Sequence, residues 1–298
     1  MQDYAIALCA LNLGFAPASP AEFAAHIDAR MAEAARQGAR LAVFPEYAIE
    51  AALAWKPAGL PPTGEMTFLA GAGAELLELL KPMPARHGVS LLCGSMPVAR
   101  EGGHTNTAIL LTADGREIRQ DKLSLTPGEQ DSESWVLTPG TVLNTFELDG
   151  LRMAILICLD VEMPALSCLL APEKIDLLLV PSMTEKRSGY HRVFGCAKAR
   201  AVELMTAVAV CGTVGAAKGT TQMETNVSGA SLFLPCEEDL GFTGIGGEIA
   251  PTGGEAGEEP FLIAEVPVEK LRRLRGGSAE VWPGAWSASH IAIGKGPV

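Results

Sequence analysis

Three residues have the side-chain types that nucleophilic catalysis needs and stand at the ends of expected strands. Glu46 follows the apolar run LAVFP, Cys158 follows the apolar run MAILI, and Lys122 comes just after an expected strand. A charge is costly to bury without a partner, and functional residues of α/β proteins gather at the carboxyl ends of strands. Singly, each has an ordinary explanation as a solvated strand end, a core cysteine or a surface lysine. Together they predict one site.

The chemistry that these side chains can carry out together is acyl transfer. A thiol attacks a carbonyl or nitrile carbon well only as the thiolate, so Cys158 needs a base, and the Glu46 carboxylate can serve. The tetrahedral intermediate carries new negative charge. The Lys122 ammonium and the backbone N–H of Leu159 can stabilise that charge.

Other kinds of catalytic site have less support in the sequence. Among the five histidines, only His104 and His191 stand where a Cys–His pair is credible, and neither belongs to a protease-like signature. No group of His, Cys and Asp has the spacing of metal ligands, and no G-x-S-x-G motif occurs. The Gly-rich stretch 241–259 lacks both phosphate-binding signatures.

The composition disfavours several classes of partner. The net charge is −12 and no run is rich in Lys and Arg, so binding to DNA or RNA is disfavoured. The cysteines number seven, which is odd, and no C-x-x-C pair occurs, so we expect free thiols in a reducing compartment. The N-terminus lacks the basic start of a signal peptide, and no apolar run approaches the roughly 18 residues of a membrane span. We therefore expect a cytoplasmic protein without a membrane partner.

The elements that must position the three residues alternate between strands and helices. Strands are expected over 4–8, 41–44, 89–93, 106–111, 116–120, 143–148, 153–157, 175–180, 206–211, 230–234 and 261–266. Helices are expected over 20–37, 65–86 with a break near 71–73, and 190–204. Asp114-Gly115 and Asp149-Gly150 predict two hairpins.

This alternation predicts an α/β protein with a mixed sheet covered by helices. Because no linker or repeat divides the chain, we expect a single domain over 1–298. The stretch 241–259 is expected to be a long surface loop, and 290–298 an exposed tail.

With these residues in place, the sequence resembles the nitrilase superfamily of carbon–nitrogen hydrolases along nearly its whole length. The segment GARLAVFPE ends at Glu46 and looks like the family's first motif, KLSLTPGE begins at Lys122 and looks like its lysine motif, and ICLD contains Cys158 and looks like its nucleophile motif. Further similar stretches are Gly94-Ser95, Asn106-Thr107-Ala108, Met163-Pro164 and Ala199-Arg200-Ala201-Val202-Glu203. The order and spacing of these pieces agree with the family.

The resemblance implies a fold and a set of roles. The fold is a four-layer α-β-β-α sandwich, with no metal or organic cofactor and with two-fold association into a homodimer or a larger even homo-oligomer. Glu46 is implied as the general base, Lys122 as the oxyanion stabiliser and Cys158 as the nucleophile. Glu129 matches a second glutamate that positions Lys122 and the substrate.

The implied activity is hydrolysis of a small amide or carbamoyl compound through a Cys158 thioester. Asp160 gives a Cys-x-Asp motif that resembles the amidase-like branches. Departures from the family pattern at Leu159, Ala165 and Ser124 leave the substrate open. A nitrilase, an acyl transferase and a catalytically silent binding or scaffold relative remain alternatives.

Several further residues are weaker candidates. Trp135, Tyr190 and Phe194 are expected either to line the pocket or to pack in the core. Asp160 either holds the backbone near the nucleophile or caps a helix. Arg200 and Glu203 form either a buried pair, a dimer contact or a plain helix-surface pair.

Overall fold

The computed structural model describes residues 3–281 and 288–294, and its framework is a pair of six-stranded sheets. The strand order is β12-β1-β2-β3-β4-β5 in one sheet and β11-β10-β9-β8-β7-β6 in the other. Both sheets mix parallel and antiparallel pairs. Strand β1 runs parallel to β2 and antiparallel to β12, and β7 runs parallel to β8 and antiparallel to β6.

The bounds of the elements are as follows. The strands are β1 Tyr4–Cys9, β2 Leu41–Val43, β3 Ser90–Arg100, β4 Gly103–Leu111, β5 Glu117–Asp121, β6 Thr145–Leu148, β7 Leu151–Ile155, β8 Leu177–Ser182, β9 Ala207–Gly212, β10 Ser228–Phe233, β11 Ile245–Thr252 and β12 Phe261–Val266. The α-helices are α1 Pro20–Arg36, α2 Glu65–Leu80, α3 Met83–His87, α4 Pro164–Leu170, α5 Arg187–Leu204 and α6 Val268–Arg273. Three 3₁₀ segments matter for the site, namely η2 Ala48–Trp55, η4 Pro127–Glu129 and η5 Cys158–Glu162.

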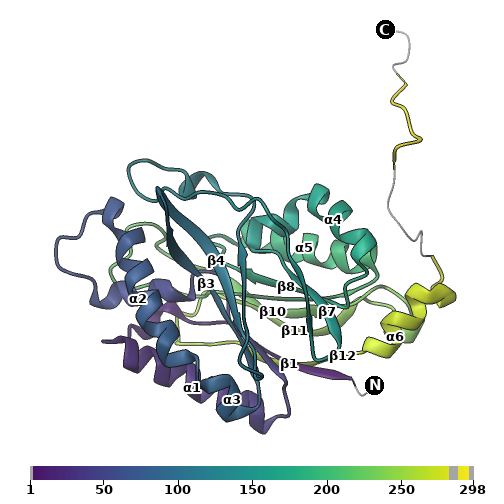
Figure 1. The fold of residues 1–298 in the computed structure, drawn as a ribbon, viewed down its shortest axis with the longest axis horizontal. Helices are drawn as coiled ribbons and strands as arrows, with labels where there is room; N and C mark the ends of the chain where they lie inside the picture. The colour runs from purple at the N-terminus through teal and green to yellow at the C-terminus, as the bar shows by residue number, and fades with distance from the viewer. Residues whose placement is uncertain (1–2, 282–287, 295–298) are drawn as a thin grey trace.

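The two sheets pack face to face, and helices cover both outer faces (Figure 1). Helices α1, α2 and α3 contact the first sheet, α5 contacts β9 and β10 of the second, and β1 contacts β9 and β10 between the layers. Along β1, Ile6 and Leu8 face the other sheet, whereas Ala7 and Cys9 pack under the helices. The alternation of side chains along a strand places both sets in apolar surroundings. The fold is therefore the four-layer α-β-β-α sandwich, and the predicted fold class is confirmed.

Both predicted hairpins are present. Strands β4 and β5 pair around Asp114-Gly115, and β6 and β7 pair around Asp149-Gly150. Asp149 and Gly150 both have positive φ, at 53° and 79°. A two-residue turn with positive φ at both positions matches the twist of the flanking strands, and Asp-Gly is a preferred sequence for it.

The helix expected over 65–86 differs from the structure in where it is interrupted. Helix α2 runs through Gly71 and Gly73 without a break, and the chain instead interrupts its helix between Leu80 and Met83. Gly73 packs closely on Met96, since an added Cβ would lie 2.9 Å from that sulfur. Glycine is therefore used here for helix–sheet packing. Pro82 ends the hydrogen bonding of α2, because proline has no N–H to donate to the carbonyl of the preceding turn.

The prediction of a surface loop over 241–259 is wrong for its middle part. Ile245–Thr252 forms β11, which pairs antiparallel with β10 at the edge of the second sheet. Its glycines allow close packing, because a Cβ on Gly246 would lie within 3.0–3.1 Å of the Leu232 and Leu234 side chains. The strand sequence IGGEIAPT has two adjacent glycines and a proline, so it lacks the apolar alternation on which the prediction depended.

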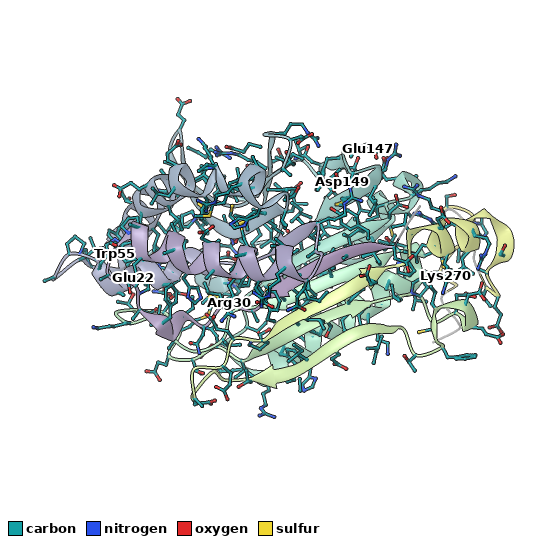
Figure 2. The ribbon with its side chains drawn as sticks, turned by 90° about the horizontal axis from the view of Figure 1, so that it is seen from below. Glu22, Arg30, Trp55, Glu147, Asp149 and Lys270 are labelled. Atoms are coloured by element: carbon teal, nitrogen blue, oxygen red, sulfur yellow. The ribbon has the colours of Figure 1, made fainter. Side chains whose placement is uncertain are left out.

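The outer parts of the molecule fit the remaining expectations. Figure 2 shows α1 along one outer face, carrying Glu22 and Arg30, and Lys270 on α6 at the opposite end from Trp55. Residues 290–294 of the predicted tail are exposed, and 295–298 lie outside the described residues. Within the described ranges, the helices are all too short or too polar to cross a membrane.

Candidate active site

Glu46 is held at the end of β2 by a close contact with the neighbouring strand. Gly94 in β3 has φ 77°, and a Cβ there would lie 2.0 Å from the carbonyl oxygen of Pro45. Only glycine permits this approach and this backbone conformation together. The next residue, Ser95, accepts a hydrogen bond from the Tyr47 N–H at 3.2 Å through its Oγ. The turn that carries Glu46 is thus fixed against β3, and the carboxylate is buried.

Lys122 and Asn106 are placed side by side by the pairing of β4 and β5. The register sets Thr107 opposite Asp121, and just beyond it the Lys122 N–H donates to the Asn106 carbonyl at 2.7 Å. Both side chains are buried, and Lys122 is only 2% exposed. The two strands therefore deliver one ammonium and one carboxamide to the same buried space.

Glu129 is fixed by donors from four other residues. Its Oε2 accepts from the Lys122 Nζ at 2.7 Å and from the N–H and Oγ1 of Thr126 at 2.9 and 3.0 Å. Its Oε1 accepts from the Tyr47 hydroxyl at 2.8 Å and the Asn106 Nδ2 at 3.1 Å. Burial alone raises the pKa of Glu129, but Lys122 and these hydrogen bonds bring it below its usual value. Glu129 is a permanent anion of the site.

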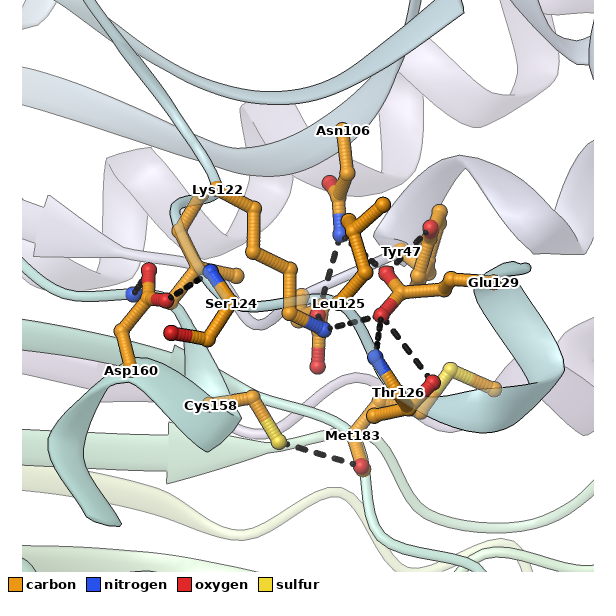
Figure 3. A network of polar contacts seen from close by, with 12 residues as sticks. Tyr47, Asn106, Lys122, Ser124, Leu125, Thr126, Glu129, Cys158, Asp160 and Met183 are labelled. Atoms are coloured by element: carbon orange, nitrogen blue, oxygen red, sulfur yellow. Dashed lines mark hydrogen bonds and ion pairs between the residues drawn. The ribbon is translucent and has the colours of Figure 1, made fainter. Parts of the chain in front are cut away.

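Glu46 shares the same ammonium but is held less firmly. Its Oε1 accepts from the Lys122 Nζ at 2.8 Å and from the Asn106 Nδ2 at 3.0 Å. Burial raises the pKa of Glu46 above its usual value, and Lys122 only partly offsets this. For Lys122 itself, burial lowers the pKa, but the two carboxylates raise it well above its usual value. The ammonium thus bonds to both glutamates, and Figure 3 shows the lysine reaching toward Glu129.

Cys158 stands at the end of β7 in a rarely used backbone conformation. Its φ is 48°, in the left-handed region that non-glycine residues seldom adopt and that recurs at functional sites. The thiol is 6% exposed and donates to the Met183 carbonyl at 3.4 Å. Burial raises the pKa of Cys158 well above its usual value, and the nearby Glu46 carboxylate raises it further. At rest the sulfur therefore carries its proton.

Asp160 ties the cysteine turn to the lysine segment. Its carboxylate accepts from the Ile157 N–H at 3.1 Å, from the Leu123 N–H at 3.2 Å and from the Ser124 N–H at 2.7 Å. The first bond belongs to the start of η5, and the other two cross to the residues that follow Lys122. Asp160 thus holds backbone on both sides of the site rather than only capping its own helix (Figure 3).

A cavity of about 410 Å³ opens onto Cys158. Leu159, Met183 and Val193 contribute apolar surface to its wall, and Gln222 and Met223 reach it from a distant part of the chain. The charged residues of its lining form two pairs of opposite charge, Glu162 with Arg192 at 3.1 Å and Glu185 with Lys186 at 3.8 Å. The charges of the lining therefore balance, and the thiol lies on the cavity wall.

The comparisons with known proteins agree with this arrangement. The sequence profile described as carbon-nitrogen hydrolase matches residues 5–275. This chain belongs to the carbon–nitrogen hydrolase family. A probable hydrolase of Bacillus subtilis is 33% identical over 201 residues, which cover 67% of this chain but only 38% of that protein. A hydrolase of Mycobacterium tuberculosis is 26% identical over 280 residues, which cover 91% of each chain.

Solved amidases share the fold of this carbon–nitrogen hydrolase. The amidase from Nesterenkonia sp. superposes with a TM-score of 0.69 at 22% identity, covering 91% of this chain and 93% of that one. In one variant of that amidase, the acetamide moiety of fluoroacetamide is added covalently at the active-site cysteine. The match shows that the two chains share a fold.

The structure of this carbon–nitrogen hydrolase brings Glu46, Lys122, Glu129 and Asp160 together around Cys158, with Leu159 on the cavity wall. It does not bring Trp135, Tyr190 or Phe194 to that wall, since none of them is among its lining residues. Tyr190 and Phe194 stack on each other at 4.1 Å within the core, and Trp135 packs on Tyr47 at 5.2 Å. Neither His104 nor His191 lines the cavity.

Two residues of the site had no role assigned from the sequence. Tyr47 and Asn106 both donate to Glu129, and Asn106 also donates to Glu46. Tyr47 directly follows Glu46, and Asn106 lies in one of the motif stretches. The sequence therefore offered a reason to consider both positions as parts of the site. Arg200 and Glu203 form an ion pair within the chain. Arg200 is buried, bonds to Glu203 at 2.7 Å and donates to the Val161 carbonyl at 3.0 Å.

Proposed function

We propose that this carbon–nitrogen hydrolase cleaves a small amide or carbamoyl compound, with Cys158 as nucleophile, Glu46 as general base and Lys122 as oxyanion stabiliser. The observation that carries the proposal is the buried Lys122 ammonium, bonded to both Glu46 and Glu129 beside the cavity that contains the Cys158 thiol. A structural role alone does not require a cation and two carboxylates next to a thiol in a dry space, because burying such groups is costly.

The first half of the proposed reaction forms a thioester. Glu46 takes the proton of the Cys158 thiol, and the sulfur attacks the carbonyl carbon of the substrate to form a C–S bond. The carbonyl oxygen becomes an oxyanion, which the Lys122 ammonium and the Leu159 N–H stabilise. The C–N bond then breaks as Glu46 gives its proton to the nitrogen, and ammonia or an amine leaves.

The second half releases the acid. Glu46 takes a proton from water, and the resulting hydroxide attacks the thioester carbon. The C–S bond breaks, a carboxylic acid departs, and the sulfur regains the proton from Glu46. Each half-reaction thus uses Glu46 once as a base and once as an acid.

The opposite pKa shifts of the two glutamates support this division of roles. A group that must take and give a proton works best when its pKa lies nearer neutral pH, and burial raises that of Glu46. Glu129 has its pKa lowered and keeps its charge, which suits a residue that holds the lysine in place. Carboxylates whose surroundings separate their pKa values are a recurrent sign of distinct acid–base roles.

The amide class is supported by the cavity and by the comparison. The charges that line the cavity balance in two pairs, and the Nesterenkonia amidase variant carries an acetamide moiety on its active-site cysteine. The seven cysteines are free thiols, which supports a working place in a reducing compartment such as the cytoplasm.

The proposal is tested by a substrate screen with a cysteine variant. Purified protein is given small amides, carbamoyl compounds and nitriles, and the released ammonia or amine is measured. We expect amides or carbamoyl compounds to give the highest kcat/KM, and Cys158→Ala to lose on the order of 10³-fold or more while staying folded. Cys168→Ala removes an exposed cysteine and is the matched control.

Two results contradict the proposal. Activity of Cys158→Ala within about tenfold of the parent excludes the thioester, because loss of a nucleophile costs several kcal/mol. A higher kcat/KM for a nitrile than for every amide and carbamoyl compound assigns the enzyme to nitriles instead. Mass spectrometry of the parent with its best substrate locates the acyl group on the peptide that contains Cys158.

A further inference from the structure

Two glutamates outside the proposed mechanism are fully buried. Glu50 lies in η2, and Glu65 is the first residue of α2. A carboxylate without bonding partners is costly to bury, so the contacts of these two residues indicate what they hold in place. No step of the proposed reaction uses either one.

Both glutamates reach the same short loop of the chain. The Oε1 of Glu50 accepts from the Thr220 hydroxyl at 2.7 Å, and the Oε2 of Glu65 accepts from the Thr221 hydroxyl at 2.9 Å. Glu65 is itself supported by the Lys56 ammonium at 2.7 Å. Two adjacent threonines thus each bond to a buried carboxyl group, and the bond to Glu65, which is paired with Lys56, is of the stronger, charge-assisted kind.

That loop, residues 215–226, is closed at its base and pressed against η2 at its middle. The Gly215 N–H donates to the Asn226 carbonyl at 3.1 Å, and the Asn226 Nδ2 donates to the Gly215 carbonyl at 2.9 Å. A Cβ on Gly219 would lie 2.9 Å from the Leu53 carbonyl oxygen. The loop is thus held at both of its ends by polar contacts rather than by regular secondary structure.

Another part of the same loop forms part of the cavity at Cys158. Gln222 and Met223, which directly follow the two threonines, line that cavity. The lining also includes Gly189 and Val193 of α5, whose position is fixed by the helix backbone. The position of Gln222 and Met223 depends instead on the side-chain anchors of their loop.

We propose that Glu50 and Glu65 are positioning residues that hold the 215–226 loop, so that Gln222 and Met223 limit the size of the substrate at Cys158. The wall they present is a carboxamide and a thioether, both neutral. The site then takes a compact amide and excludes bulky ones. This inference rests on the proposed function, because a limit on substrate size presupposes a substrate at Cys158. The access of reagents past this wall to Cys158 can nevertheless be measured without turnover.

The test loosens the loop without touching the glutamates. Glu65 also accepts from the Trp135 indole N–H at 3.0 Å, and Trp135 packs on Tyr47 of the catalytic cluster, so its replacement would disturb two regions. The double variant Thr220→Val/Thr221→Val removes the two bonds to the glutamates. It also removes two bonds inside the loop, which the Gln222 N–H and Nε2 donate to the two hydroxyls at 3.2 and 3.3 Å. Thr206→Val is the control, since it also loses one buried hydroxyl, bonded to the Ile175 carbonyl at 2.8 Å at the start of β9.

The readout is the alkylation of Cys158 by a small and a large probe. Iodoacetamide and its N-phenyl analogue are compared, and the labelled Cys158 peptide is followed by mass spectrometry. Losing the two hydrogen bonds between the loop and the glutamates is expected to change the alkylation of Cys158. The rate constant for the large probe, divided by that for the small probe, should rise at least about fivefold. Thr206→Val should keep the ratio within about twofold of the parent. With amides, the double variant should raise KM and leave kcat within about threefold.

Met223→Ala shortens a side chain of the wall itself. It distinguishes the anchoring role of the glutamates from the size limit set by the loop. If Met223→Ala raises the probe ratio and the threonine variant does not, the anchoring role of the glutamates is contradicted. If neither variant raises it, the loop is not the size-limiting wall. If the variants raise the probe ratio but the parent protein hydrolyses no amide, the proposed function is rejected and the size-limiting wall is still supported.

Discussion

At the scale of single residues, Glu129 differs from Glu46 in how many donors hold it. Lys122, Thr126, Tyr47 and Asn106 all donate to Glu129, and its pKa falls in spite of burial. Glu129→Gln keeps the shape of the side chain but removes the charge that aims Lys122. We expect kcat/KM to fall roughly 10²-fold, comparable to losing one oxyanion donor.

The measurement is steady-state kinetics on the best amide, with Glu133→Gln as control. Glu133 is an exposed residue of the same region and should leave kcat/KM unchanged. Covalent labelling of Cys158 should persist in Glu129→Gln, because the nucleophile and its base remain. Kinetics of Glu129→Gln close to those of the parent would remove this residue from the catalytic cluster while leaving Glu46, Lys122 and Cys158 in place.

Glu50 makes a second residue-scale prediction, which concerns pH. Burial raises its pKa from the usual 4.5 to about 7, and the neighbouring Glu65 adds to this, although the Thr220 hydroxyl opposes it. The folded state therefore prefers protonated Glu50. The stability from this group is fully present below about pH 4.5 and is lost as the pH rises through about 7. The loss is on the order of 3 kcal/mol.

Urea unfolding between pH 5 and pH 8 compares the parent with Glu50→Gln. The free energy of unfolding of the parent should fall over this range relative to that of the variant, since other titrating groups are common to both. Parallel pH curves for the two proteins would show that Glu50 does not titrate in this range.

At the scale of elements, the approach of β3 to the end of β2 depends on Gly94. A Cβ there would lie 2.0 Å from the Pro45 carbonyl oxygen, so the strand must move away from the turn that carries Glu46. We expect Gly94→Ala to destabilise the protein by several kcal/mol and to lower kcat strongly. Urea unfolding and steady-state kinetics measure both effects.

Gly115 provides the matched control for Gly94. It also has positive φ, at 88°, but an added Cβ would meet nothing within 4 Å. Gly115→Ala should therefore cost only the backbone strain, about 1–2 kcal/mol, and leave kcat unchanged. Equal losses for the two variants would show that backbone strain, rather than the contact with Pro45, explains the need for glycine at 94.

The elements also show which parts of the structure the sequence could predict. The runs LAVFP and MAILI read as strands because both faces of their sheets are covered, and the Asp-Gly pairs fixed two hairpins. Edge strand β11 was missed, since its two adjacent glycines and its proline interrupt the apolar alternation. The bonds of Asn106 and Tyr47 to Glu129 depend on strand register and on the Gly94 contact. These are properties of three-dimensional packing that no local pattern encodes.

At the scale of the whole molecule, the outer layer formed by α4 and α5 leaves apolar side chains uncovered. These helices contact each other on the outside of the second sheet (Figure 1), and Leu169 on α4 is 62% exposed and Val202 on α5 is 45% exposed. Exposed apolar residues on neighbouring elements are a feature of association surfaces. The two-fold association implied by the family resemblance would cover them.

We therefore predict a homodimer that is joined through α4 and α5. Light scattering at micromolar concentration should give twice the chain mass of 31.2 kDa, or a larger even multiple. Val202→Glu places a charge in the apolar contact and should shift the protein to the monomer, because an uncompensated buried charge is costly. Leu79→Glu on α2, a residue 41% exposed in the opposite layer, should not. A monomer mass for the parent would contradict the association, and a Val202→Glu protein that stays dimeric would place the contact on another surface.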